Sequence, residues 1–193
     1  WEAGPGDIVY IPPELAHHGI SLDDECTTLS IGYRSYLNNE MLSALELPNN
    51  KKDAYLKDPI WEVNINPAEI PQSAIDQTKR LLNINKLPED FFGCFVTKLD
   101  PEDEKKFNEV RAYNSQEKME EFDLYHLHPI CKAAYQFMNK ELRVFINGEV
   151  FNSEGIDDDL VINFFNTRKL KLDNKNKALA ERLTSLSLIE KSQ

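Results

Sequence analysis

The chain has 193 residues and a net charge of −11, and its apolar content is sufficient for one large or two small folded domains. Its acidity disfavours general binding to nucleic acid, because the phosphate groups would be repelled. No stretch is apolar over the length needed to cross a bilayer. The three cysteines, Cys26, Cys94 and Cys131, are too widely spaced for a disulfide framework or a zinc site, so we expect a reducing cytoplasm.

Two strands are predicted in the first 36 residues. Residues 7–11 are β-branched and aromatic, and Pro12-Pro13 ends this strand because proline cannot donate to a ladder. A second strand is predicted over residues 27–33, with small polar side chains on the face that carries Thr28 and Ser30. A strand at Gly6-Asp7 has no earlier strand to pair with, and we expect the chain to be the C-terminal part of a longer protein.

A helical segment is predicted over residues 37–100. Helical spacing of apolar residues indicates one helix from residue 38 to about 47 and another that Ser73 caps and that ends near residue 84. A third helix follows Pro88, with an apolar stripe that includes Phe91, Phe92 and Phe95. This stripe is typical of a core or a dimer face.

Residues 101–123 are dense in charge and poor in aliphatic side chains, which predicts a linker with some helix near residues 117–122. Residues 124–193 are predicted to form a small winged-helix-like domain. It contains strands at 133–138 and 142–146, a tight turn at Asn147-Gly148, a helix beginning near Asp157, and a last helix over 174–190 that Asp173 caps.

The opening stretch resembles a known family of enzymes. Gly6-Asp7-Ile8-Val9-Tyr10-Ile11-Pro12-Pro13, Ala16-His17-His18-Gly19 and Ser30-Ile31-Gly32-Tyr33-Arg34 resemble the second conserved box of cupin-type, JmjC-like oxygenases. The similarity is strongest to the bacterial ribosomal oxygenases, which hydroxylate an arginine of a ribosomal protein with iron(II) and 2-oxoglutarate. The resemblance implies an α+β fold: the end of a double-stranded β-helix (1–36), a helical dimerisation segment (37–100), a charged linker (101–123) and a winged-helix-like domain (124–193).

The resemblance also implies roles for individual residues. His17 takes the place of the distal histidine of the iron-binding triad, and a facial triad of two histidines and one carboxylate is what iron(II) oxygenases use. Ser30 matches the hydroxyl residue that helps to hold the 2-oxoglutarate carboxylate, and Thr28 points the same way. The alternative for both residues is that their hydroxyl groups only form part of a polar face of the sheet. His18 could either support the metal ligand from behind or be structural, and Arg34 could either be structural or contact the substrate.

The family's first box, which supplies the other two metal ligands, does not precede His17 in this sequence. We therefore expect the 193-residue segment to be inactive, with activity only in the intact protein. The implied partners are a ribosomal protein substrate and a second copy of the chain, with no membrane.

Other features favour alternative readings. His126 and His128 have the spacing of a metal-binding pair, but Pro129 follows at once and no Gly-Asp…Pro…His box lies downstream, so we do not expect a metal site there. A basic patch suggests DNA binding, whereas the nearby acidic run at 157–159 opposes it; its residues are Lys169, Lys171, Lys175 and Lys177. A non-catalytic module of cupin remnant and winged helix that binds protein or DNA is the competing hypothesis.

Overall fold

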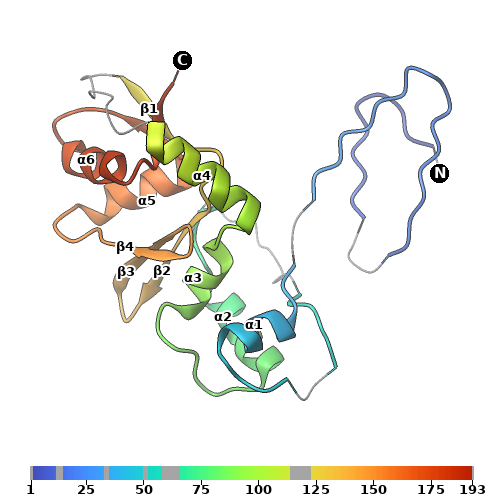
Figure 1. The fold of residues 1–193 in the computed structure, drawn as a ribbon, viewed down its shortest axis with the longest axis horizontal. Helices are drawn as coiled ribbons and strands as arrows, with labels where there is room; N and C mark the ends of the chain where they lie inside the picture. Colours follow the sequence, from blue (N-terminus) through green and yellow to red (C-terminus); the bar gives the residue numbers. More distant parts are fainter. Residues whose placement is uncertain are drawn as a thin grey trace. The chain divides into compact units, whose positions relative to one another are not determined.

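The computed structural model describes residues 2–11, 15–32, 35–49, 52–57, 66–113 and 123–192 (Figure 1). The chain divides into two compact units, residues 1–34 and residues 35–193. No helix among the described residues has the length and apolar character that a membrane span requires.

The N-terminal unit contains no helix or strand within its described residues. Strands were expected at 7–11 and 27–33, and the described parts of both segments are irregular and exposed; Ile8 is 95% and Leu29 is 85% exposed. An extended segment persists as a strand only when its main chain is paired and one face is covered. The bonds found here are local, such as that from the Gly4 amide to the Asp7 carboxylate at 2.8 Å.

The second unit begins with three helices, α1 (Asn38–Ala44), α2 (Gln72–Leu82) and α3 (Phe91–Thr97), in the region where a helical segment was predicted. Buried Asn38 holds residues 52–54 against α1, since its amide donates to the Lys52 carbonyl and accepts from the Ala54 amide. The predicted cap of α2 is wrong. Ser73 lies inside the helix, and Pro71 occupies the capping position without a side-chain bond.

Helix α4 (Pro101–Tyr113) occupies the first part of the predicted linker, so the prediction of a linker is wrong for residues 101–113. Its start has strong signals: Pro101 is the first helical residue, acidic side chains fill the first turn, and Asp100 accepts from the Asp103 amide at 3.0 Å. Among residues 101–112 of α4, whose burial the structure describes, Phe107 is the one buried hydrophobic side chain. The helix predicted near 117–122 lies outside the described residues.

One three-stranded sheet has the order β2-β3-β4 and is antiparallel throughout, with bounds β2 (Ala133–Met138), β3 (Glu141–Ile146) and β4 (Glu149–Phe151). The predicted turn at Asn147-Gly148 is confirmed, because both residues have positive φ, 52° and 88°. Helix α3 packs on this sheet so closely that a Cβ at Gly93 would lie 2.3 Å from the Phe145 ring.

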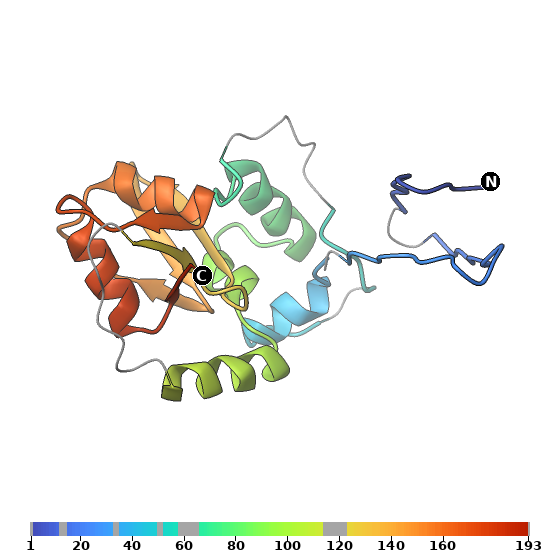
Figure 2. The same cartoon turned by 90° about the horizontal axis from the view of Figure 1, so that it is seen from above.

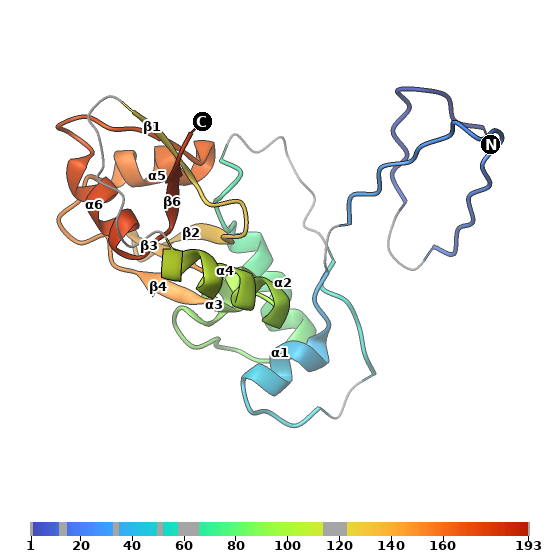
Figure 3. The same cartoon turned by 45° about the horizontal axis from the view of Figure 1, so that its top comes forward.

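A second three-stranded sheet has the order β5-β1-β6, with bounds β1 (Leu124–Leu127), β5 (Lys169–Lys171) and β6 (Ile189–Lys191) (Figure 3). Helix α5 (Asp158–Thr167) begins as predicted, with the Asp157 carboxylate accepting from two amides. Helix α6 (Lys177–Ser185) is shorter than predicted. It ends where Ser187 adopts φ 55°, and Ile189, expected on the helix, pairs with Leu127 in the sheet.

Helices α4, α5 and α6 and both sheets share a large core that includes the fully buried Val161, Phe164 and Leu183. Helices α1, α2 and α3 form a second core with Phe145 of β3. Figure 2 shows the helices arranged around the sheets of this unit. Asn166 of α5 ties the chain before α2 to the sheet: it accepts from the Ala68 amide at 3.1 Å and donates to the Tyr135 hydroxyl at 3.2 Å. The winged-helix part and the preceding helices are therefore packed together within this unit.

Candidate functional site

The residues that the sequence singles out for metal and cosubstrate lie in the N-terminal unit. His17, Thr28 and Ser30 are all exposed, and the one hydrogen bond found for the His17 ring is local, from Nδ1 to the Leu15 carbonyl at 3.1 Å. Within the described residues, no hydrogen bond joins His17 to either hydroxyl residue. Pro12-Pro13 and Arg34 lie outside the described residues.

These residues do not by themselves fit an iron centre. Such a centre needs three protein ligands on one face of the metal, and His17 is one. A cluster of three or more His, Cys, Asp or Glu side chains with metal-binding geometry does not occur among the residues that the structure describes. The predicted roles of His17, Thr28 and Ser30 stay predictions.

The two histidines near β1 have a defined place. His126 lies opposite Glu190 in the β1–β6 ladder, and its Nε2 is 2.9 Å from Glu190 Oε1 while its Nδ1 is 3.0 Å from Ser192 Oγ. His128 Nε2 lies 3.5 Å from the other oxygen of Glu190, and its ring contacts Phe107 edge-on. One carboxylate thus bridges two imidazoles and fastens β6 to β1.

The basic patch is exposed, as the sequence suggested, but it is partly neutralised. Lys169 and Lys171 flank buried Leu170 on β5, and Lys177 lies 3.9 Å from Glu181 on α6. The acidic residues 157–159 stand at the start of α5.

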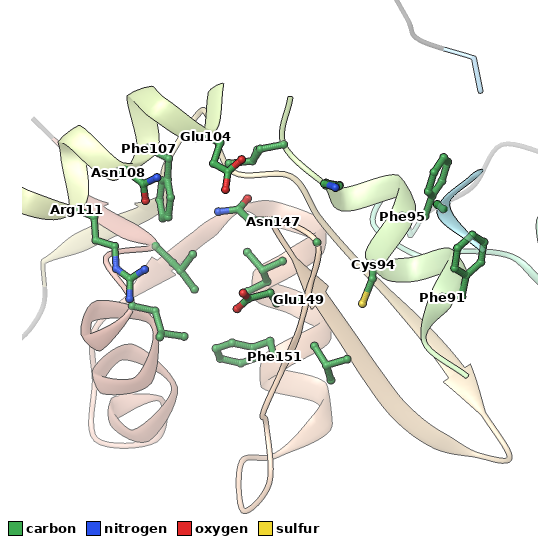
Figure 4. Close-up of a pocket in the computed structure, with 18 residues that line it drawn as sticks. Phe91, Cys94, Phe95, Glu104, Phe107, Asn108, Arg111, Asn147, Glu149 and Phe151 are labelled. Carbon is green, nitrogen blue, oxygen red and sulfur yellow. The ribbon is translucent and has the colours of Figure 1, made fainter. Parts of the chain in front are cut away.

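A groove in the second unit was not anticipated from the sequence. It has a volume of about 490 Å³ and lies between α3, α4 and β4 (Figure 4). Cys94 lines it, and burial, together with the carboxylates of Asp90 and Glu149, raises the pKa of this thiol and so disfavours its thiolate form. The sequence signal for this groove was the helical spacing of Glu104, Asn108 and Arg111, which lie in the segment that was predicted to be a linker.

Two protein-family profiles match different parts of this chain. A family profile described as the JmjC domain matches residues 1–41, and one described as the ROXA-like winged helix matches residues 80–189, more than half of the chain. The chain belongs to the ribosomal oxygenase family. The winged-helix match covers α3 to α6, strands β1 to β5 and both His126 and His128, and it ends one residue before Glu190.

A relative within this family is the ribosomal protein uL16 3-hydroxylase of Escherichia coli (strain K12), which is 30% identical over 103 residues. The match covers 50% of this chain and 27% of the length of that protein. No solved structure matches significantly. The comparisons confirm a mixed helix-and-sheet chain with JmjC and winged-helix parts, as the resemblance implied.

Proposed function

We propose that this ribosomal oxygenase chain is part of an iron(II)- and 2-oxoglutarate-dependent dioxygenase that hydroxylates a side chain, arginine, of a ribosomal protein. The observation that carries the proposal is the occurrence in one chain of a JmjC match at residues 1–41 and a ROXA-like winged helix at residues 80–189. The relative's printed name, a hydroxylase of a ribosomal protein, supports the substrate class.

In this proposal His17 is one of three iron ligands, and Ser30 with Thr28 binds a carboxylate of 2-oxoglutarate through hydroxyl hydrogen bonds. The remaining two metal ligands come from elsewhere in the intact protein, within the double-stranded β-helix of which residues 1–36 form the end. The 193-residue segment is inactive alone, because one imidazole does not hold iron in a usable geometry.

The proposed partners follow from charge and from the helices. A net charge of −11 complements a basic ribosomal protein and disfavours nucleic acid. The helical segment carries the partly buried Phe91 and Phe95, stacked at 5.6 Å, and the ring of Tyr36, just before the segment, lies 5.1 Å from Phe95. We propose that this segment contributes to a homodimer, and that the protein works in the reducing cytoplasm, where its three cysteines stay free.

A second candidate is a non-catalytic binding module. It is favoured by the contrast between a well-packed winged-helix part and the lack of a metal-binding cluster in the described part of the chain. The two candidates differ in one measurable property, which is whether His17 contributes to iron binding.

The test is an anaerobic iron(II) titration by calorimetry of the longer protein of which we propose this chain to be part. His17→Ala is expected to weaken iron binding by at least about tenfold, since it removes a ligand from the metal. His126→Ala is the matched control and should bind iron as wild type does, because His126 lies in the β1–β6 ladder of the other unit. Unchanged affinity in His17→Ala would overturn the assignment and favour the binding module.

A further inference from the structure

The turn between β3 and β4 contains a chemically labile dipeptide. Asparagine is a thermolabile residue, and it is most labile before glycine, which hinders attack on its side chain least. The chain contains Asn-Gly once, at Asn147-Gly148. In deamidation the Gly148 nitrogen loses its proton and bonds to Cγ of Asn147, the Cγ–Nδ2 bond breaks, and ammonia leaves a succinimide ring. Water then opens this ring to aspartate or isoaspartate, so the reaction needs no oxidant, reductant or enzyme.

The fold restrains the attacking nitrogen. The Gly148 amide donates to Thr97 Oγ1 at 3.1 Å, and this hydroxyl donates in turn to the Gly93 carbonyl at 2.8 Å within α3. Thr97 is 2% exposed, and a Cβ at Gly148 would lie 3.3 Å from Lys98 Cα, so the end of α3 closely covers the amide. A nitrogen that is hydrogen-bonded to a buried hydroxyl is held away from the Asn147 side chain and from base in the solvent.

The carboxamide under attack is restrained as well. Asn147 Oδ1 accepts from the Lys132 amide at 3.0 Å, and Nδ2 lies 3.5 Å from the buried Cys131 Sγ. Rotation of this side chain toward Gly148 would break both contacts and leave the Lys132 amide unpaired, which costs free energy. Both reacting groups are therefore held by residues outside the turn.

We propose that Asn147-Gly148 is a deamidation site that the fold keeps closed through Thr97, and that it opens when α3 separates from the β3–β4 turn. The product is not reversed by refolding. Isoaspartate adds one methylene group to the main chain of the turn and disrupts the pairing of Glu149 with Ile146, which sets the register of β4. A transient local opening thus becomes a lasting covalent change. This site is independent of the proposed iron chemistry.

The first test compares deamidation of the wild-type 193-residue chain in native buffer and in urea, both mildly alkaline. One tryptic peptide, residues 144–168, contains the site, and tandem mass spectrometry distinguishes asparagine, aspartate and isoaspartate at position 147. Asn147 should deamidate at least about tenfold more slowly in the folded chain than in urea, because the reaction requires the site to open.

The second test removes the acceptor of the Gly148 amide. Thr97→Val keeps the shape of the side chain and should raise the rate of deamidation in the folded chain about three- to tenfold, since one hydrogen bond is lost. Thr78→Val is the matched control. Thr78 is also buried and donates to the carbonyl four residues before it, that of Ala74, at 2.9 Å, but it lies on α2, and its loss should leave the rate as in wild type.

Three results would overturn the proposal: equal rates in folded and unfolded wild type, no acceleration in Thr97→Val, or equal acceleration in Thr97→Val and Thr78→Val. The last result would show that any loss of stability exposes the site and that Thr97 has no particular part in closing it. The comparison of wild type in buffer and in urea decides the matter even if a variant does not fold.

Discussion

The two units of this ribosomal oxygenase chain differ in what holds their residues in place. In the N-terminal unit the described residues 15–32 are all exposed, including the proposed iron ligand His17. In the second unit Phe145 and Phe164 are 0% exposed and belong to extended cores. The unit with the recognisable chemical motif therefore lacks local packing, and the well-packed unit contains no metal-binding cluster among its described residues.

A sequence motif and the spatial arrangement of its residues therefore depend on different parts of the protein. The Gly-Asp…Pro…His pattern is encoded within a few residues, whereas the position of His17 relative to other ligands depends on strands that lie beside it in a closed barrel. In the second unit the sheets are covered within the unit itself, because α3, α5 and α6 pack directly on them.

The largest expected effect compares a core residue with an exposed one. Phe164→Ala should lower the free energy of unfolding by about 3–5 kcal/mol, because it removes a fully buried ring and leaves a cavity. Leu29→Ala, at a position 85% exposed, should change it by less than about 0.5 kcal/mol. Urea unfolding of the 193-residue chain measures both. A loss above about 1 kcal/mol for Leu29→Ala would show that the N-terminal unit has a packed core of its own.

A smaller effect is expected at the start of α4. The hydrogen bond from the Asp103 amide, assisted by nearby Lys132, lowers the pKa of Asp100 from its ordinary value of 3.8. A carboxyl with a lowered pKa stabilises the fold above its ordinary pKa, and this stabilisation is lost as the pH falls through the folded value. Asp100→Asn should therefore reduce the melting temperature at pH 7 and lose this difference in acid. Thermal unfolding between pH 7 and pH 2 tests this, and a difference independent of pH would contradict it.

Local chemistry allowed several elements to be predicted well. The Asn147-Gly148 turn and the Asp157 cap follow from conformational and hydrogen-bonding preferences that act within a few residues. Helix α4 was missed because its charged composition indicated a linker, although Pro101 and the acidic first turn mark a helix start. The end of α6 was placed too late, since Leu186 and Ile189 continue a helical apolar pattern while tertiary pairing with β1 takes Ile189 into a strand.

The candidate sites also differ in how far the sequence alone predicts them. His17, Thr28 and Ser30 could be named from a motif, but no pattern in the sequence gives their spatial relation. The groove needs α3, α4 and β4 together, and its residues lie more than 50 positions apart, from Cys94 to Phe151. The bridge from His126 and His128 to Glu190 likewise depends on the register of β1 with β6.

Amide hydrogen exchange of the 193-residue chain tests the contrast between the two units most directly. Amides in residues 15–32 should exchange at nearly unprotected rates, while those of β2, β3 and α5 should be strongly protected, because only the latter are hydrogen-bonded within a buried core. Protection of residues 7–11 or 27–32 comparable to that of β3 would show instead that the N-terminal unit forms stable strands by itself.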